Sequence, residues 1–215
     1  MPNLKEDPDH RSAAPVTAAT RAALLGHRGA IVWLTGLSAS GKSTLAAGLE
    51  QNLARARVLS VVLDGDVLRT GLGRDLGFSD ADRKENIRRT AEAALLLAET
   101  GAVVVTALIS PFREDRRQIA DRCKARGVAF AEVFINAPIA ECERRDPKHL
   151  YQRARAGKIP SFTGIDSPYE APLSPALELH TDRESVGQSL EKLTALALSL
   201  ARPPEPTAGA RGADI

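Results

Sequence analysis

Residues 36–43 read GLSASGKS, which has the spacing of a phosphate-binding loop: a glycine, four residues, then Gly-Lys-Ser. An apolar, β-branched run precedes this segment and a helix-forming run follows it, as such a loop requires. The glycines let backbone N–H groups face phosphate oxygens, the lysine suits the β- and γ-phosphates, and the serine hydroxyl suits Mg²⁺. The alternative is a glycine-rich turn with an incidental lysine. We expect a nucleoside triphosphate and Mg²⁺ to bind here, with nucleotide contacts from Gly36, Leu37, Ser38, Ala39, Ser40, Gly41, Lys42, Ser43 and Thr44.

Two carboxylates follow the next apolar run, in the sequence Asp64-Gly65-Asp66, and Arg69 comes shortly after them. At the carboxyl end of a strand they would face the phosphate loop across the sheet edge. One of them would then support Mg²⁺ beside Ser43, and one would accept a proton from an attacking hydroxyl. Asp-Gly is also a frequent turn pair, so a plain β-turn is the alternative.

Arg83 and Asn86 lie one helical turn apart in a polar stretch and therefore share a face. An arginine beside an amide suits an anionic ligand that also forms hydrogen bonds. The alternative is a solvated, charged helix that begins at Ser79, since Ser79 and Asp82 fit a capping arrangement. Spacing alone favours neither interpretation.

Three further segments hold candidate ligand contacts. Ser110 lies where a third apolar run ends at Pro111, which places its hydroxyl near the ligand crevice unless it is an ordinary turn serine. The basic stretch 148–158 suits a lid over phosphates, although a solvated basic helix has the same charge. Phe162 is notable in a chain with 4% aromatic residues, and we expect it either to stack on a base or to fill the loop's interior.

The elements that must position these residues alternate between strand-like and helix-like segments. This alternation predicts an α/β fold of the P-loop NTPase type, with three layers and a central parallel sheet of about five strands covered by helices on both faces. Ligands then bind beyond the carboxyl ends of the strands. We expect strands at 30–35, 58–63, 102–107, 128–135 and, more weakly, 177–180, and helices at 42–54, 83–100, 114–126, 139–145 and 185–200.

Composition limits the classes of function and the compartment. With 29 basic and 27 acidic residues, the chain lacks the dense positive charge of a broad nucleic-acid-binding surface. No apolar run approaches the ~20 residues of a membrane-spanning helix, and the first residues lack the apolar core of a secretory signal. Cys123 and Cys142 fit buried free thiols better than a disulfide. We expect a cytoplasmic protein that binds small molecules, without nucleic-acid or membrane partners.

The chain is expected to form one domain between two arms. Residues 1–28 are polar and predict an N-terminal arm with a short helix near 18–25. Residues 29–201 predict one kinase-like domain whose lid covers about 146–170. Residues 202–215 are rich in Pro, Gly and Ala and predict a disordered tail.

Six segments together resemble the adenylylsulfate kinase (APS kinase) family, in the family's order and over roughly residues 28–200: GLSASGKS, DGDVLR, GFSDADRKENIRR, ISPFREDR, RDPKHLYQRARAG and FTGIDSPYEAP. A phosphate loop alone indicates only a superfamily, whereas its combination with the other segments is far more specific. The resemblance implies transfer of the ATP γ-phosphoryl group to the 3′-hydroxyl of adenosine 5′-phosphosulfate (APS). The product is 3′-phosphoadenosine 5′-phosphosulfate, the activated sulfate donor. The resemblance also implies a homodimer.

The resemblance implies roles for single residues. Asp66 is similar to the catalytic carboxylate beside the 3′-hydroxyl, and Lys42 to the lysine on the transferred phosphoryl group. Ser110 matches a serine described in the family as a phosphoserine intermediate; its role stays open, because a kinase can transfer phosphoryl directly and the motif offers no dedicated base. The implied APS contacts are Asp64, Asp66, Arg69, Phe78, Arg83, Asn86, Ile109, Ser110, Lys148, Phe162 and Thr163, with Phe78 and Phe162 on either side of the adenine. Arg153 and Arg155 resemble lid cations, Arg144 is expected against the ATP adenine, and Ser43 and Asp64 are the expected metal ligands.

Three positions depart from the family pattern: Val67 replaces Asn, Gln152-Arg153 replaces paired lysines, and His149 replaces Gly. Val67 removes a polar contact, so we expect weaker acceptor binding, and His149 is expected to stiffen the lid hinge because Gly adopts more backbone conformations. Two other functions remain open. One is a kinase for a small metabolite such as gluconate or shikimate, against which the aromatic pair and the ISPF segment argue. The other is a nucleotide-dependent switch, which acceptor-dependent turnover would exclude.

Overall fold

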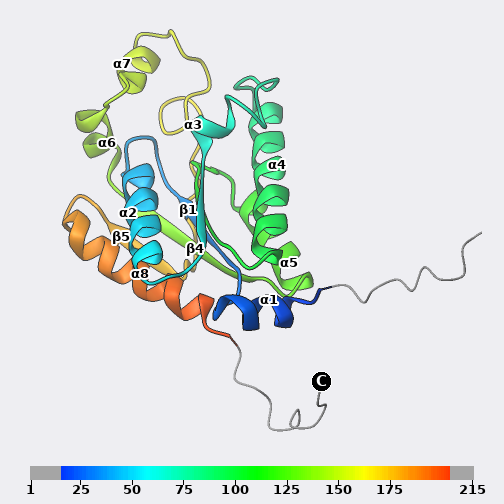
Figure 1. The fold of residues 1–215 in the computed structure, drawn as a ribbon. Helices are drawn as coiled ribbons and strands as arrows, with labels where there is room; N and C mark the ends of the chain where they lie inside the picture. Colours follow the sequence, from blue (N-terminus) through cyan, green and yellow to red (C-terminus); the bar gives the residue numbers. More distant parts are fainter. Residues whose placement is uncertain (1–15, 204–215) are drawn as a thin grey trace, which may run out of the picture.

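Five parallel strands form one sheet at the centre of the computed structural model, which describes residues 16–203. The strand order is β2-β3-β1-β4-β5 (Figure 1). The central strand, β1, is buried along its whole length, which explains its continuous apolar sequence. The strands are β1 (Ala30–Thr35), β2 (Ser60–Asp64), β3 (Val103–Ala107), β4 (Ala129–Asn136) and β5 (Leu177–His180).

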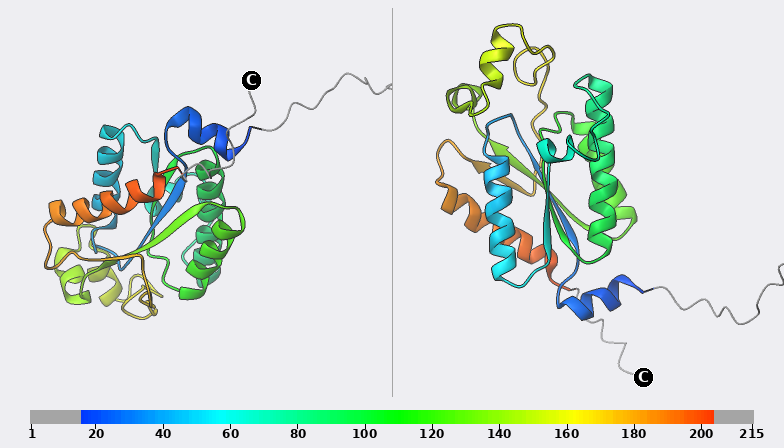
Figure 2. Two further views of the ribbon diagram at one scale, coloured as in Figure 1. Left: turned by 90° about the horizontal axis from the view of Figure 1, so that it is seen from below. Right: turned by 45° about the horizontal axis from the view of Figure 1, so that its top comes forward.

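Helices cover both faces of this sheet. On one face lie α2 (Lys42–Arg55) and α8 (Val186–Ala201), and on the other lie α4 (Asp80–Glu99) and α5 (Arg113–Ala125) (Figures 1 and 2). Each face has its own apolar core, because the inner strands bury side chains on both sides. The predicted α/β fold with three layers is therefore confirmed.

Three short helices lie beyond the carboxyl ends of the strands. They are α3 (Gly65–Leu68), α6 (Ile139–Arg145) and α7 (Leu150–Arg155), and the last two form the upper part of the molecule in Figure 1. A third apolar cluster holds this upper part together, with buried side chains from Ala137, Cys142, Tyr151, Ala154 and Phe162. This cluster packs the region expected to act as a lid against α6 and the phosphate loop, since partly buried Leu37 and Ala39 also contact it.

The helix expected near residues 18–25 is present as α1 (Ala18–Leu25) and lies at the opposite end of the sheet from the short helices. The turn after it is fastened to the domain. The backbone N–H of Leu59 donates to Nε2 of buried His27 at 3.0 Å, and Nε of Arg28 donates to the Leu200 carbonyl at 2.8 Å. Most of the expected N-terminal arm and most of the expected tail, residues 1–15 and 204–215, lie outside the described residues.

Both cysteines, Cys123 and Cys142, are buried free thiols, as expected. Among residues 16–203, none of the helices has the length and apolar character needed to cross a bilayer.

Candidate functional site

The glycine-rich loop connects β1 to α2 and has the backbone geometry of a phosphate cradle. Gly41, directly before the helix, has φ +105°, which L-residues with side chains rarely adopt. At Gly36 a Cβ atom would lie 2.4 Å from the Ile135 carbonyl oxygen, so this position has no room for a side chain. The loop ends at the N-terminus of a 14-residue helix, where free N–H groups and the helix dipole favour an anion.

Lys42, the first residue of α2, is buried inside the loop. Its Nζ donates to the carbonyl oxygens of Gly36 at 2.9 Å and Leu37 at 2.6 Å. Burial lowers the pKa of Lys42 from 10.5 to about 8, against the opposing effect of the carboxylates of Asp64 and Asp66. A desolvated ammonium group at this place attracts phosphate oxygens strongly.

Ser43 and Asp64 meet between the loop and the end of β2. The Ser43 hydroxyl donates to Asp64 Oδ2 at 2.6 Å, and Asp64 Oδ1 accepts the backbone N–H of Asp66 at 2.9 Å. Asp64 therefore caps α3 and holds its carboxylate against the phosphate loop. Two hard oxygen ligands in contact suit Mg²⁺, which commonly binds one or two protein oxygens together with phosphate.

Asp66, in the first turn of α3, forms an ion pair with Lys148 of the lid. The contact with Asp66 raises the pKa of Lys148. His149, the next residue, is the N-cap of α7 and has φ +53°. This left-handed conformation is one that Gly adopts without strain. Val67, beside Asp66, exposes 68% of its surface.

Arg69 and Arg83 enclose the loop that precedes α4. Arg69 Nη1 donates to the Gly77 carbonyl at 2.8 Å, and its guanidinium lies 4.3 Å from the centre of the Phe78 ring. Arg83 Nε donates to the Phe78 carbonyl at 2.9 Å. Burial, and then the like charge of Arg83, lower the pKa of Arg69. Two neighbouring cations of this kind attract an anionic ligand.

Arg83 also joins this loop to the lid. Its Nη1 donates to Thr163 Oγ1 at 2.9 Å and its Nη2 donates to the Ser161 carbonyl at 2.5 Å. Phe162, between these partners, is buried and packs edge-on against Tyr151 at 5.0 Å between ring centres, whereas Phe78 exposes 63% of its surface. The structure therefore brings the two segments together through Arg83, while the Phe162 ring faces the lid's core and the Phe78 ring faces solvent.

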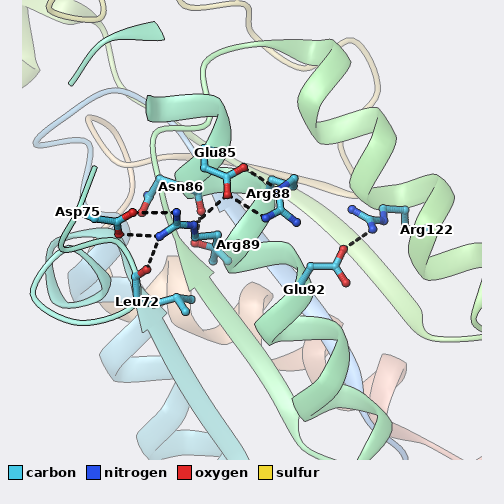
Figure 3. Close-up of polar contacts among 9 residues, drawn as sticks. Leu72, Asp75, Glu85, Asn86, Arg88, Arg89, Glu92 and Arg122 are labelled. Atoms are coloured by element: carbon cyan, nitrogen blue, oxygen red, sulfur yellow. Dashed lines mark hydrogen bonds and ion pairs between the residues drawn. The ribbon is translucent and has the colours of Figure 1, made fainter. Parts of the chain in front are cut away.

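Asn86 of α4 packs against the loop that precedes this helix. It is buried, and a Cβ atom at Gly73 would lie 2.6 Å from its Oδ1. Arg89, one turn on, donates to the Leu72 carbonyl at 3.0 Å and to the Asp75 carboxylate at 2.7 Å (Figure 3). Helix α4 is held in turn by a pairing of its Glu92 with Arg122 of α5, also drawn in Figure 3. The loop before α4 is thus fixed to this helix.

Ser110 lies at the carboxyl edge of β3, but its hydroxyl points into the protein. The residue is 2% exposed, and its Oγ accepts a hydrogen bond from the Trp33 indole Nε1 at 3.0 Å. Its backbone has φ +38°, in the left-handed region. Next to it, the Ile109 carbonyl accepts a hydrogen bond from Thr35 Oγ1 at 2.7 Å. Ser110 therefore lies at the expected edge of the sheet, but its hydroxyl is hydrogen-bonded to Trp33.

Arg145 is a candidate site residue that sequence reasoning missed. Arg144 pairs with Glu141 and leaves 72% of its side chain exposed. Arg145 instead donates to Thr181 Oγ1 at 3.1 Å and to the Thr181 carbonyl at 2.7 Å, beside the phosphate loop. Thr181 Oγ1 donates in turn to the Ser40 carbonyl at 2.8 Å. The signal was present in the sequence, because the matching segment RDPKHLYQRARAG begins at Arg145.

The expected lid cations lie on the short helix α7. Arg153 is exposed, and Arg155 Nη2 donates to the Glu143 carboxylate of α6 at 2.7 Å. Neither arginine belongs to the third apolar cluster, which packs beneath α7.

Comparison with known proteins agrees with this geometry. A family model described as adenylylsulphate kinase matches residues 28–180. The adenylyl-sulfate kinase of Citrobacter koseri is 53% identical over 190 residues, which cover 88% of this chain and 91% of that protein. A structure of the Mycobacterium tuberculosis APS kinase CysC in complex with AMPPNP and APS has a TM-score of 0.76 and 48% identity, over 80% of this chain and 98% of that one.

A more distant likeness concerns the fold alone. A gluconokinase from Sinorhizobium meliloti superposes with a TM-score of 0.56 at 18% identity, over 80% of this chain and 93% of that one. Such low identity carries no information about the acceptor, whereas the family model covers the phosphate loop, the DGD segment and the lid. This chain therefore belongs to the adenylylsulphate kinase family.

Proposed function

We propose that this adenylyl-sulfate kinase transfers the ATP γ-phosphoryl group directly to the 3′-hydroxyl of APS, with Asp66 as the base. The observation that carries the proposal is the short chain of contacts between donor and acceptor sides. Ser43 of the phosphate loop bonds Asp64, Asp64 holds the backbone of Asp66, and Asp66 pairs with Lys148 of the lid. A carboxylate is thus held next to the phosphate site, where an acceptor hydroxyl must lie for in-line transfer.

On the donor side, Lys42 and the loop N–H groups would stabilise charge on the transferred phosphoryl group. Ser43 and Asp64 would hold Mg²⁺, whose bound form neutralises charge on the β- and γ-phosphates. Arg145 and Thr181 are the best candidates for contacts with the ATP base, since both lie against the loop backbone. The M. tuberculosis relative was solved with AMPPNP, which supports ATP as the donor.

On the acceptor side, we assign the phosphosulfate to Arg69 and Arg83, and the adenine to the Phe78 ring. Arg83 would also hold the lid over the bound nucleotide through Ser161 and Thr163. When APS binds, Lys148 would move from Asp66 to the substrate and release the base. Asn86 and Ile109 would act through the backbone segments that they support. The same M. tuberculosis complex contains APS, which supports this acceptor.

The Phe78→Ala variant tests the stacking role. Because Phe78 is 63% exposed, its removal should leave thermal stability unchanged. Loss of a base–aromatic stack costs about 1–3 kcal/mol, so the KM for APS should rise roughly 5- to 150-fold while the KM for ATP stays within about twofold. Steady-state kinetics with each substrate varied separately measures both constants. Leu96→Ala, at another exposed apolar position, is the control; equal effects on both substrates would contradict the assignment.

The Ser110→Ala variant separates direct transfer from a phosphoserine intermediate. Removing the hydroxyl leaves the Trp33 indole N–H without its partner, so we expect a loss of about 1–3 kcal/mol in the free energy of unfolding. If transfer is direct, kcat should stay within about tenfold of the wild type, whereas removing a true nucleophile can cost on the order of 10⁶. Ser199→Ala, on the exposed face of α8, serves as the control. Phosphoserine at position 110 after incubation with ATP alone, found by mass spectrometry, would refute direct transfer.

The function as a whole is tested by turnover with ATP, Mg²⁺ and APS, followed by detection of the 3′-phosphorylated product. Gluconate and shikimate in place of APS should give no ADP above background. ATP hydrolysis without any acceptor should be slow, because the base is paired with Lys148. ADP formation at the same rate with and without APS would contradict the proposal.

We further propose that the enzyme works as a homodimer in a reducing cytoplasm. The dimer rests on the family resemblance alone, and light scattering after size exclusion measures it directly. The compartment is supported by two buried cysteines that remain thiols.

A further inference from the structure

The end of the lid is fastened to the loop that follows β3. The backbone N–H of Glu170 donates to the Pro111 carbonyl at 2.9 Å. In the other direction, the backbone N–H of Arg113 donates to Glu170 Oε2 at 2.8 Å, and Arg113 Nε donates to the Ala171 carbonyl at 2.7 Å. Residues 169–171 and 109–113 therefore form one hydrogen-bonded unit, which we call the clamp.

Arg116 of α5 lies at the centre of the clamp. Its side chain is 2% exposed, and its guanidinium uses three donors in three directions. Nη1 donates to the Ser110 carbonyl at 2.5 Å, Nη2 donates to the Glu170 carbonyl at 2.7 Å, and Nε pairs with the Glu132 carboxylate on β4. One buried cation thus joins the 109–113 loop, the end of the lid and the sheet.

Tyr169 provides a second connection between the same parts. Its hydroxyl lies 3.1 Å from Thr35 Oγ1, which donates to the Ile109 carbonyl at 2.7 Å. The Tyr169 ring stacks on Phe134 of β4 at 5.9 Å between ring centres. The lid's end is therefore held to the strands β1 and β4 as well as to the loop.

The clamp acts on backbone that is strained. Ser110 has φ +38°, a conformation that a residue with a side chain keeps only where its surroundings hold it. The carbonyls of Ile109 and Ser110 are the groups that Thr35 and Arg116 bind. Without Arg116, the Ser110 carbonyl keeps only the longer hydrogen bond from Thr35 Oγ1, at 3.4 Å, and the lid's end loses one of its attachments.

We propose that Arg116 is a positioning residue for the acceptor nucleotide. It fixes the 109–110 backbone in the form that APS contacts, and it sets the point about which the lid closes over APS. This inference rests on the proposed function, because it concerns the acceptor assigned there. Arg116 itself is too deeply buried to touch either substrate.

A purely structural role for Arg116 would have a different outcome. A buried arginine that only stabilises the fold would lower the free energy of unfolding and reduce the amount of active enzyme, with unchanged KM values. A positioning role raises the KM for APS selectively, because the phosphate loop and Lys42 share no contact with the clamp among the described hydrogen bonds.

The test measures kcat and both KM values for Arg116→Met and Arg116→Lys. Arg117→Met is the matched control, since Arg117 is the next residue on α5, is 70% exposed and pairs with Glu114 at the surface. Of the three hydrogen bonds that Arg116→Met removes, the two to the clamp carbonyls of Ser110 and Glu170 should raise the KM for APS by about 10- to 100-fold, with the KM for ATP within about twofold. Arg116→Lys keeps the charge but cannot span three acceptors, so its effect should be intermediate.

Tyr169→Phe keeps the inference testable if Arg116→Met does not fold. It removes one hydroxyl from the second connection and should raise the KM for APS about threefold, again without changing the KM for ATP. Folded variants with wild-type KM values for APS, or with equal increases for both substrates, would overturn the inference alone. If the wild-type protein fails to turn over APS at all, the proposed function falls, and the assignment of Arg116 to this acceptor falls with it.

Discussion

An Asp66→Asn enzyme should bind ATP as the wild type does and lose about 10²- to 10⁴-fold in kcat with APS, the usual contribution of a general base. Asparagine has nearly the same shape as aspartate but cannot take the proton of the 3′-hydroxyl. The structure favours a catalytic effect over a structural one, because the Asp66 side chain is 69% exposed and its partner Lys148 is 58% exposed. An exposed ion pair of this kind contributes little to stability.

The measurement combines steady-state turnover with ATP titration by calorimetry. Asp121→Asn is the control, since Asp121 lies on the exposed face of α5. If the variant loses ATP binding as well as kcat, Asp66 would have to be assigned to the ATP site and not to the acceptor hydroxyl. Turnover within about threefold of the wild type would leave the reaction without an assigned base.

Most of the architecture was predictable because it follows from local patterns that burial reinforces. The strands β1 and β5 begin and end where the sequence predicted. β1 is a short apolar run between two glycines, whereas β5 alternates leucine with polar residues and was the weaker prediction. The helices α3 and α7 were not among the expected helices. They have four and six residues, which is too short for helical periodicity, and their stability depends on contacts with neighbouring segments.

The residues of the site were predictable by type and less so by orientation. The glycines and Lys42 have one geometry that fits their spacing, and the structure shows it. Ser110 and Phe162 had two interpretations each, and the choice depends on contacts with Trp33 and Tyr151 that the local sequence does not reveal. Arg144 and Arg145 are adjacent and chemically identical; the matching segment that begins at Arg145 favoured the second, and in the structure its contacts with Thr181 distinguish it. Arg116 ends the matching segment ISPFREDR, but its role was not predictable, because its three partners come from three different segments.

A Lys42→Met enzyme should lose about 10³-fold or more in kcat/KM, because the charge on the transferred phosphoryl group then has no buried cation opposite it. Methionine fills most of the volume of the lysine stem and removes only the ammonium group. The control is Lys124→Met, at an exposed position on α5, which should leave kcat/KM unchanged. Activity within about tenfold of the wild type would show that Lys42 stays on the loop carbonyls during turnover.

The same variant should change how stability depends on pH. The pKa of Lys42 is about 8 in the folded protein against 10.5 for an ordinary lysine, so the unfolded chain binds the extra proton between these values. The free energy of unfolding of the wild type therefore gains from this group as pH rises from about 8 towards 10.5, and below pH 8 the buried charge lowers stability. Lys42→Met lacks this gain.

The stability of Lys42→Met relative to the wild type should thus be greatest near pH 7 and should fall as pH rises through 8 to 10.5. Denaturant unfolding of both proteins at several pH values measures this difference. Tyr169, whose pKa burial raises to about 12, is present in both proteins and cancels in the comparison. A difference that stays constant with pH would mean that Lys42 keeps its ordinary pKa in the loop. A difference that falls would mean that the folded protein gives up stability to hold a desolvated cation where the phosphates bind.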